Sequence, residues 1–513
     1  MNRHLWKNLF LVVLAGVLVL TSALPALATG DTGGLSLPLT DKPVTLTWMV
    51  PADVENLNDL PVIKEISRRT GINLNMIPYP KKSYPEKLDT IMAGGDLPDI
   101  INGIALAQTN EYGKVGAFAN LMDYVDVLPN FKSLIIDNPD NSWVTFAWAT
   151  EDGAVYRWPI YGLNRDVNHG ILYRADIMEE LGLEPWTDVD GFYNALVKMK
   201  EAYPDSYPFS SKNGENLFRD LARYWNISDG RYPFFYDEAD GQWKFTGATA
   251  QYLELLDLLK KMYDNALLDP EFLTDTQDSW SAKMTTNRSF VAWDWVDRMN
   301  LLAAQVKDTM PQFNLKFANP IGSGKQHPLA LIDNWGPSVA AGPNEELALK
   351  LLDYMFSPEG SELFTIGIEG ETFTWNENGV PYYPGVEDQS SITVDGLTEL
   401  YGMWIEGAYV RPDRRSIYYQ YSPNVQEAQD IGHKVGFNER DPMIVMTDAE
   451  NETFTEIFTQ LEKEIMAFSA KYVTDPSYGS EQRDAFLKAA EGMRLQEALD
   501  ILNAAQARFD EQK

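Results

Sequence analysis

The tripeptide Trp293-Asp294-Trp295 combines two residue types whose spacing suits ligand chemistry. It ends a short apolar run that predicts a buried strand. The indole rings supply flat apolar surfaces and the carboxylate supplies directional acceptors, and a sugar ring, with one C–H face and a rim of hydroxyls, needs both. We expect the two indoles to face opposite ways, one toward a binding site and the other toward the core, with Asp294 pointing opposite to both neighbours. Core packing of both rings is the alternative, because tryptophan is largely buried in any fold.

Three polar or aromatic residues follow other predicted strands. Asp53, Asn102 and Trp335 stand just after apolar runs, and therefore at strand carboxyl ends, where open α/β sheets bind ligands. We include all three as ligand-binding candidates, although each could instead serve a turn or a helix cap.

Two more tryptophans and one arginine complete the set of candidates. Trp225, in FRDLARYW, and Trp404, in YGMWIEG, could stack on a ligand, while bulky core packing is the competing explanation. Arg411 forms a compact basic cluster with Arg414 and Arg415. A guanidinium can bind a uronate carboxylate through two hydrogen bonds. Ordinary surface ion pairing is the favoured alternative for this cluster.

Catalysis has little support in the sequence. Beyond residue 28 the histidines are His169, His327 and His433, which stand far apart, and the patterns GxSxG, HExxH and GxxxxGK[ST] do not occur. The EF-hand spacing D-x-[DN]-x-[DN]-G is missing too. We therefore predict no catalytic residue, no metal and no cofactor. Because the chain has 75 Asp and Glu residues, a pair of cleft carboxylates could still arise, and a secreted glycoside hydrolase remains an alternative.

The charge balance and the start of the sequence bear on partners and location. A net charge of −33 repels phosphate backbones and predicts no nucleic-acid partner. Arg3 and Lys7, the apolar run 9–20 and Ala26-Leu27-Ala28 form the pattern of a secretory signal peptide, 1–28, cut after Ala28. The sequence contains no cysteine, which excludes disulfides, thiolate metal sites and a cysteine-linked lipid anchor.

Strand and helix patterns alternate in the region that follows. Apolar runs at 45–50 and 72–77 predict strands, a helix over 58–69 lies between them, and a third strand begins near Asp99. This alternation predicts an α/β fold with mostly parallel sheets flanked by helices. Residues 29–43 are rich in glycine and threonine without apolar periodicity, which predicts a flexible leader.

Longer phrases carry a family resemblance. LLDYMFSPEG followed by GIEGE, within 351–371, resembles bacterial extracellular solute-binding proteins of the lipoprotein/aldouronate-binding type, distant relatives of maltose-binding protein. GGDLPDI, LYRADIMEELGLEPWTDVDGF and LLKKMYDNALLDPEF extend the resemblance over nearly all of the sequence after the signal peptide. Relatives of the maltose-binding type place a stacking tryptophan at the strand end that corresponds to 293–295.

The resemblance implies a periplasmic-binding-protein-like α/β fold: two lobes joined by a hinge, each built on a central, mostly parallel sheet flanked by helices. It places residues 31–158 and 326–372 in an N-terminal lobe. Residues 161–318 and 378–513 then form a C-terminal lobe, which would contain Trp225 and Trp404.

The implied function is ligand capture without catalysis. An exported monomer, periplasmic or at the cell surface, would bind an oligosaccharide between its lobes by hinge closure. It would then deliver the sugar to the membrane permease subunits of an ABC importer. A binding protein for a peptide or another non-sugar solute is the second alternative, besides the hydrolase.

Overall fold

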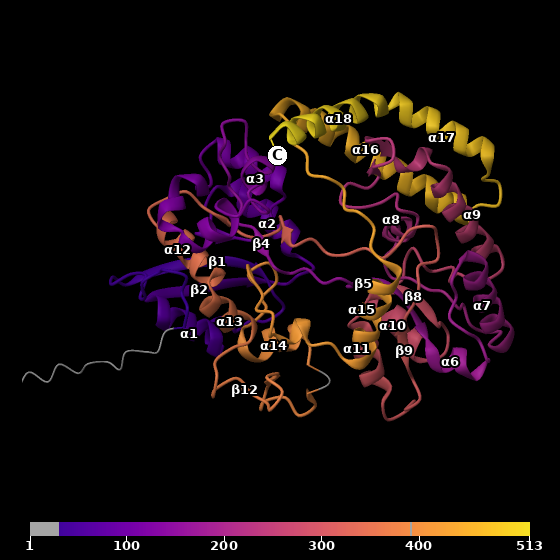
Figure 1. The fold of residues 1–513 in the computed structure, drawn as a ribbon, viewed down its shortest axis with the longest axis horizontal. Coiled ribbons are helices and arrows are strands. Elements are labelled where there is room, and N and C mark those ends of the chain that lie inside the picture. The colour runs from indigo at the N-terminus through magenta and orange to yellow at the C-terminus, as the bar shows by residue number, and fades with distance from the viewer. Residues whose placement is uncertain (1–29, 390–391, 513) are drawn as a thin grey trace, which may run out of the picture.

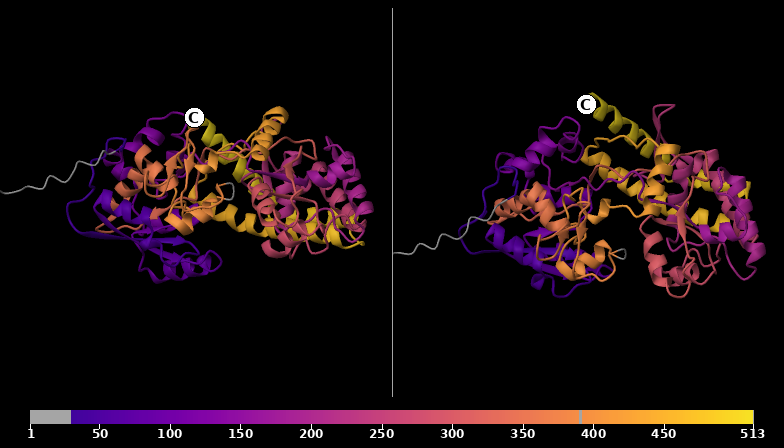
Figure 2. Two further views of the ribbon diagram at one scale, coloured as in Figure 1. Left: turned by 90° about the horizontal axis from the view of Figure 1, so that it is seen from below. Right: turned by 60° about the horizontal axis from the view of Figure 1, so that its bottom comes forward.

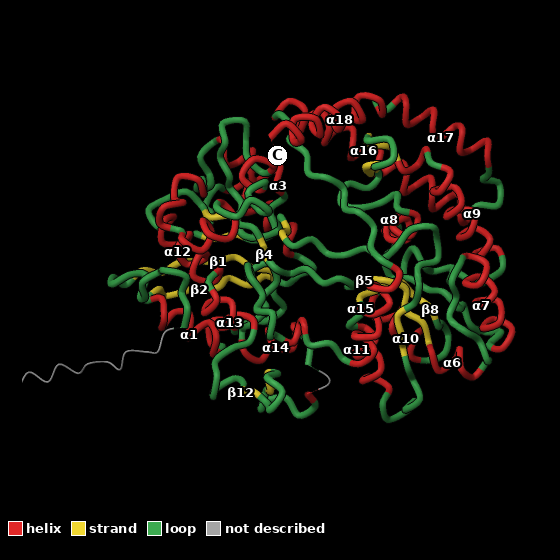
Figure 3. Tube along the Cα trace, viewed as in Figure 1, coloured by secondary structure: helices red, strands yellow, loops and turns green. Residues whose placement is uncertain are grey.

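The computed structural model describes residues 30–389 and 392–512, so the predicted signal peptide lies outside the described residues. Two lobes lie side by side in Figure 1, one holding the early, indigo part of the chain and the other its middle, magenta part. The view from below in Figure 2 shows the same division. Loops make up most of the chain that passes between the lobes (Figure 3).

The sheet of the first lobe has the strand order β2-β1-β3-β11. Its strands are β1 (Val44–Pro51), β2 (Ile72–Tyr79), β3 (Ile100–Ile101) and β11 (Ser338–Val339). β1 runs parallel to β2 and β3, whereas β11 is antiparallel to β3. The chain adds β11 after it has visited the second lobe, so this sheet is completed by a segment more than 200 residues away from β3 in sequence.

Helices of the first lobe begin and end at the residues that favour such boundaries. Pro61 opens α1 (Pro61–Thr70), and Gly71 ends it in the left-handed conformation with φ of 76°. The other helices of this lobe are α2 (Tyr84–Gly94), α3 (Leu106–Lys114), α4 (Pro129–Phe131), α5 (Val144–Ala147), α12 (Glu345–Phe356), α13 (Pro358–Thr365) and α14 (Val394–Tyr401). The predicted strands at 45–50 and 72–77 and the helix between them are therefore confirmed.

The second lobe is built on a sheet of order β8-β5-β9, comprising β5 (His169–Arg174), β8 (Val291–Trp295) and β9 (Leu315–Phe317). Both pairs are antiparallel, so the prediction of a mostly parallel sheet is wrong for these strands. The physical reason is the route of the chain. β5 leads away from the point where the chain enters the lobe, and β8 and β9 lead back toward it.

Helices cover this second sheet and extend beyond it. They are α6 (Ala175–Glu180), α7 (Val189–Ala202), α8 (Asn216–Ala222), α9 (Ala250–Asp264), α10 (Gln277–Thr285), α11 (Arg298–Val306), α15 (Pro423–Val435), α16 (Asp448–Thr474), α17 (Ser480–Gly492) and α18 (Leu495–Gln512). A hairpin of β6 (Phe234–Asp237) and β7 (Gln242–Phe245) packs with them. In Figure 1 the yellow helices α16 to α18 arch from the second lobe back toward the first.

Three segments connect the lobes, and we call them the first (162–168), second (322–331) and third (413–422) crossings. The first and second are tied by the Leu329 amide, which donates to the Arg165 carbonyl at 3.1 Å. The Tyr418 hydroxyl donates to the Leu163 carbonyl at 3.0 Å, which ties the third to the first. The Arg165 guanidinium also lies 3.7 Å from the centre of the Tyr418 ring. These contacts gather all three crossings into one hinge region. Short strands flank it: β4 (Ile160–Tyr161) pairs with β10 (Ile332–Asp333).

The boundary predicted at residue 378 is wrong. Tyr383, Leu397 and Ile405 belong to the hydrophobic core of the first lobe, together with Trp404. The hairpin of β12 (Thr374–Trp375) and β13 (Pro381–Tyr382) introduces this segment. The chain reaches the core of the second lobe again at Val425. Burial of these aromatic and aliphatic side chains, a tertiary effect, keeps residues 383–389 and 392–412 with the first lobe.

The prediction of a flexible leader at 29–43 is also wrong for residues 30–43, which the structure describes. The Leu39 amide donates to the Thr70 carbonyl at 2.8 Å, and the Glu359 amide donates to the Asp31 carbonyl at 3.0 Å. Leu35, together with Leu37 and Leu39, packs against the core of the first lobe. Three leucines at alternate positions, rather than the glycines and threonines, decide how this segment lies.

Candidate ligand-binding site

Both tryptophans at the end of β8 contact one histidine. In the antiparallel pair, His169 lies opposite Trp295 and Ile171 lies opposite Trp293. The His169 ring stacks on Trp293 with centroids 5.0 Å apart and planes 12° apart, and its centroid lies 4.3 Å from that of Trp295. Our expectation that the indoles face opposite ways is wrong, because alternate residues of a strand share a face.

The two indoles nevertheless differ in exposure. Trp293 is 7% exposed and belongs to the core of the second lobe, whereas Trp295 is 46% exposed. A fully built apolar core rarely leaves half of an indole in water without a reason, because aromatic rings contribute large areas when buried. Trp295 is thus the tryptophan of this pair that a ligand can reach.

Asp294 is engaged by cations on the other face of the strand. It is 2% exposed, its Oδ2 lies 2.9 Å from Lys212 Nζ, and its Oδ1 lies 3.6 Å from Arg298 Nε. The same Oδ1 accepts a hydrogen bond from the Trp295 amide at 2.8 Å. The carboxylate therefore fixes the end of β8 and is not directed at the surface that carries Trp295.

A small cavity opens beside His169 and Trp293, where the second crossing meets the second lobe. Its volume is about 10 Å³, which is room for roughly one water-sized group. Its lining residues come from β5, β8, the 3₁₀ turn η4 (Arg223–Trp225) and the second crossing: His169, Arg223, Tyr224, Trp293, Gln326, His327 and Leu329.

Two glycines allow the second crossing to approach η4 this closely. A Cβ on Gly322 would lie 2.5 Å from the Tyr224 carbonyl oxygen, and one on Gly324 would lie 2.8 Å from the same atom. The Gly324 amide donates to that carbonyl at 2.6 Å. Any side chain at either position would push the crossing away from η4, so Gly322 and Gly324 set the width of the cavity.

Two buried polar atoms that belong to lining residues have no hydrogen-bond partner among the described residues: Arg223 Nε and Gln326 Oε1. By contrast, the Tyr224 hydroxyl accepts a hydrogen bond from the Ile171 amide at 3.0 Å. Buried polar groups are nearly always paired, so an unpaired donor and an unpaired acceptor in the wall of one cavity call for a ligand group or water.

The two histidines of the cavity are held neutral at pH 7. Burial lowers the pKa of His169 to about 3, and Arg223 lowers it further by its charge. Asn168 Nδ2 donates to His169 Nδ1 at 2.9 Å, which leaves the ring proton on Nε2. Burial also lowers the pKa of His327, against the opposing effect of the carboxylate of Asp229.

The ion pair between Asp229 and Arg440 holds the His327 ring in place. Asp229 Oδ1 lies 3.0 Å from His327 Nε2, and Asp229 Oδ2 lies 3.0 Å from Arg440 Nε. Burial alone would raise the pKa of Asp229, but the hydrogen bond from His327 and the charge of Arg440 outweigh it and lower that pKa. Arg440 also donates to the Pro328 carbonyl at 2.7 Å. The second crossing is thereby fixed to the second lobe.

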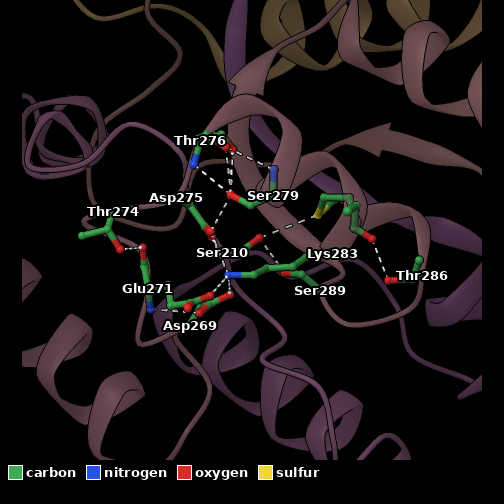
Figure 4. A network of polar contacts seen from close by, with 12 residues as sticks. Ser210, Asp269, Glu271, Thr274, Asp275, Thr276, Ser279, Lys283, Thr286 and Ser289 are labelled. Carbon is green, nitrogen blue, oxygen red and sulfur yellow. Dashed lines mark hydrogen bonds and ion pairs between the residues drawn. The ribbon is translucent and has the colours of Figure 1, made fainter.

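A second polar network holds the beginning of β8 (Figure 4). Lys283 Nζ lies 2.8 Å from Asp269, 2.7 Å from Glu271 and 2.7 Å from Asp275. Nearby, the Ser289 hydroxyl donates to the Ser210 hydroxyl at 2.7 Å. The segment at Ser210 bridges β8, since its amide donates to the Val291 carbonyl at 3.0 Å. This network therefore positions the strand that carries both tryptophans.

Three candidates of the first lobe converge on the segment 404–410. Asn102 accepts from Trp48 Nε1 at 2.7 Å and donates to the Glu406 carbonyl at 3.0 Å. Trp335, half-buried between β10 and β11, lies edge-on to Tyr409 with centroids 5.8 Å apart. Trp404 is buried, and its Nε1 donates to the Thr365 carbonyl at 2.8 Å. Trp404 thus lies in the first lobe, so its predicted place in the second is wrong.

The remaining candidates are not among the residues that line the cavity. Asp53 is exposed and accepts from the Lys81 amide at 3.1 Å. Arg411 donates to the Phe356 carbonyl at 2.6 Å in the first lobe. Trp225 is buried in the core of the second lobe, with its Nε1 3.3 Å from Glu254. In each of these three at least one polar atom of the side chain has a partner within the protein.

Sequence reasoning missed Arg223, Gln326 and the role of His169. Arg223 and Gln326 are about a hundred residues apart, and no local pattern connects them. The available signal was the pair of glycines in the phrase IGSGK, since such glycines mark close approaches of the backbone. Across the described ranges, no group of three or more His, Cys, Asp or Glu side chains is arranged to hold a metal ion.

Comparison with known sequences gives consistent matches. The profile of the bacterial extracellular solute-binding protein family matches residues 60–362. The chain is 25% identical over 353 residues to the fructooligosaccharide ABC transporter substrate-binding protein FusA of Streptococcus pneumoniae serotype 4, covering 63% of each protein. It is 24% identical over 368 residues to the polygalacturonan/rhamnogalacturonan-binding protein YtcQ of Bacillus subtilis, covering 66% of this chain and 70% of YtcQ. The match to FusA thus spans less than two thirds of that protein.

Solved structures share the fold over a greater length. The alginate-binding protein AlgQ2, in a crystal structure without calcium ion, has a TM-score of 0.76 at 22% identity over 92% of this chain and 99% of its own. FusA in complex with kestose has a TM-score of 0.72 at 18% identity, over 91% of this chain and 100% of its own. At these identities the likeness establishes the fold, and it confirms the predicted two-lobe α/β class.

Proposed function

We propose, because this chain belongs to the bacterial extracellular solute-binding proteins, that it captures an oligosaccharide between its lobes and hands it to an ABC importer. The relatives FusA and YtcQ carry names that state binding of fructooligosaccharides and of polygalacturonan or rhamnogalacturonan. A carbohydrate is therefore the ligand class that the family relationship favours.

The observation that carries this proposal is the exposed indole of Trp295 beside the polar cavity. A sugar ring can place its C–H face on Trp295, which is 46% exposed, while a substituent of the ring reaches toward Arg223 and Gln326. This arrangement supplies the apolar platform and the converging polar groups that a sugar site requires.

Capture requires that the lobes move relative to each other, and the hinge region is suited to that. Its three crossings are held by contacts among themselves, such as Gly162 N to Leu331 O at 2.7 Å. Torsion changes in these loops can close the lobes while both sheets stay intact. The site contains no nucleophile next to a base, so the bound sugar leaves chemically unchanged.

Titration with defined oligosaccharides tests the proposal. Melting of the purified protein is followed with neutral and acidic oligosaccharides, and each hit is measured by calorimetry. A ligand that binds the folded state at 100 times its Kd stabilises it by about 2.7 kcal/mol, which is readily visible as a higher Tm. The ligand is then recovered and analysed for cleavage. If no oligosaccharide raises Tm, or a sugar is cleaved, the proposal is wrong.

A binding role also implies partners and a place outside the cytoplasm. The family is described as extracellular, and the pattern of residues 1–28 fits export. No helix within the described ranges has the length and apolar character needed to cross a membrane. We propose that the protein acts as a monomer that docks on membrane permease subunits, and light scattering with and without sugar measures its oligomeric state.

A further inference from the structure

Arg165, in the first crossing, is a buried arginine that binds three separate parts of the chain. Its side chain is only 3% exposed, and its Nη1 lies 2.9 Å from Asp297 Oδ2. The same Nη1 donates to Asn168 Oδ1 at 3.4 Å, and Nη2 donates to the Tyr418 carbonyl. Burial removes the water that would otherwise solvate this cation, so the protein groups have to replace that water.

Two of these partners adjoin the end of β8 that carries the exposed indole. Asp297 follows Trp295 by two residues and stands directly before α11. Asn168 Nδ2 donates to His169 Nδ1 at 2.9 Å, and the His169 ring in turn contacts the Trp295 ring. Two chains of contacts therefore link Arg165 to Trp295, one through Asp297 and one through Asn168.

The third partner connects Arg165 with the first lobe. Tyr418 stands in the third crossing, and its ring belongs to the hydrophobic core of the first lobe. Arg165 contacts both the carbonyl and the ring of this residue. Because a guanidinium is planar and its N–H groups point in fixed directions, Arg165 sets the Tyr418 carbonyl and the Asp297 carboxylate relative to each other. The lobes can rotate only if these groups move together or the buried cation loses partners, which is costly.

We propose that Arg165 is the positioning residue that couples occupation of the Trp295 site to closure of the lobes. A ligand on Trp295 holds the end of β8 and with it Asp297, and Arg165 transmits that constraint to Tyr418 and the crossings. A ligand shifts an equilibrium only through interactions that differ between the two states, and this connection makes the contacts at Trp295 depend on how the lobes are set. The inference rests on the proposed function and names the residue through which the hinge responds.

The test measures the closed fraction directly. The chain contains no cysteine, so Val115→Cys in the first lobe and Lys198→Cys in the second, both at exposed positions, accept a single pair of spin labels. With a saturating oligosaccharide taken from the titration above, the parent should show at least about ten closed molecules for each open one. Arg165→Lys keeps the charge but loses the planar fork. Its ratio should fall to about one or less, and its Kd should rise roughly 5-fold or more.

A double-mutant cycle separates coupling from a merely structural role. Trp295→Ala should weaken binding by about 30-fold in the parent, but by less than about 10-fold in the Arg165→Lys background, because residues that act through one another are not additive. If Arg165 only stabilises the hinge, its variant lowers Tm, closes fully at saturation and still loses about 30-fold on Trp295→Ala. That result would overturn the inference.

Two further variants complete the experiment. Asp297→Asn removes the ion pair from a side chain that is 52% exposed, so it should remain folded even if Arg165→Lys does not, and it should show the same partial closure. Arg414→Lys is the matched control. Arg414 lies 4.4 Å from the Tyr419 ring and donates to the Asn164 carbonyl at 3.1 Å, contacts that stay within the hinge region. It should close as the parent does.

The outcomes distinguish this inference from the proposed function. Full closure of Asp297→Asn, or an equally partial closure of Arg414→Lys, would overturn the role of Arg165 while leaving sugar capture intact. Failure of the parent to bind any oligosaccharide would instead defeat the proposed function and, with it, the inference that rests on it.

Discussion

Each lobe contributes a group of aromatic side chains near the hinge. The first group is Trp335 and Trp404 with Asn102, and the second is Trp293 and Trp295 with His169 and the cavity beside it. The two groups differ in whether the buried polar atoms around them are paired. In the first lobe Trp404 Nε1 donates to the Thr365 carbonyl and both ends of the Asn102 amide have partners. At the second lobe, Arg223 Nε and the Oε1 of Gln326 in the second crossing have none among the described residues. Aromatic content alone therefore does not identify a binding surface.

The contrast has a physical explanation. A buried indole whose N–H already has a hydrogen-bond partner stabilises the fold. Exposing that indole to a ligand would break this hydrogen bond. An exposed indole beside unpaired polar atoms leaves those interactions to be made by the ligand. We therefore expect changes in the first group to affect stability, and changes in the second to affect affinity or its dependence on pH.

The largest effect is expected for Trp404→Ala. Its indole is buried and lies 5.3 Å from the Tyr409 ring and 5.4 Å from the Tyr418 ring. The free energy of unfolding should fall by about 3–5 kcal/mol, as for other buried Trp→Ala truncations, while the folded fraction keeps its affinity for sugar within 3-fold. Urea unfolding and calorimetry at low temperature measure the two. A 30-fold loss of affinity without loss of stability would reverse the assignment of the two groups.

The next largest effect is a loss of stability expected when the Lys283 network that holds β8 is broken. Lys283→Met removes the ammonium that three carboxylates share, and the direct partners Asp269 and Asp275 are almost fully buried. Burial alone would lower the pKa of Lys283, but the hydrogen bonds to the carboxylates outweigh it and raise that pKa. Unfolding should become easier by about 2–4 kcal/mol, slightly less than for a fully buried pair because the lysine is partly exposed.

Lys198→Met is the control for Lys283, since Lys198 forms an exposed pair with Glu201 at 2.6 Å. It should cost less than about 1 kcal/mol. Equal stability of the two variants would show that the network in Figure 4 does not hold β8.

The features that could be predicted from the sequence are those that depend on residues close together in the chain. β1, α1 and β2 are specified by local periodicity, by Pro61 at a helix start and by Gly71 at its end, so they could be predicted. The lobe boundary could not be predicted, because Tyr383 and its neighbours pack against core residues of the first lobe that are distant in sequence. Family resemblance supplied the two-lobe class, but not the sheet directions of the second lobe.

The site shows the same limit more sharply. The tryptophan pair could be located from three adjacent residues, yet the partner that both rings share, His169, follows from strand register. Arg223 and Gln326 meet because the second crossing returns past η4, a contact that neither local sequence contains. Charges and cavities that depend on long-range packing need the fold before they can be seen.

Affinity should respond most to Trp295→Ala. Its ring is exposed, so truncation leaves the core intact and should cost less than about 1 kcal/mol of stability. Loss of a stacking anchor costs on the order of 2 kcal/mol in binding, or about 30-fold in Kd. Trp375→Ala is the matched control, because Trp375 is a partly buried tryptophan of the first lobe that packs on Phe373. Titration of both variants with one sugar decides the matter: equal affinities would show that Trp295 is not the platform.

The smallest effect is a pH dependence that belongs to the second group alone. Burial holds the pKa of His169 near 3, below the value of 6.5 of an ordinary histidine. The unfolded chain therefore binds more protons between pH 6.5 and 3, so stability is lost as the pH falls through that window. From pH 7 to 5.5 this loss should be about 1 kcal/mol. His169→Gln should lack it, while His433→Gln, whose side chain is 60% exposed, should keep the parent's profile. Urea unfolding of the three proteins at both pH values measures the difference. A constant difference between parent and His169→Gln would mean that the ring takes up a proton freely in the folded protein, and the cavity would then be open to water rather than closed around a single ligand oxygen.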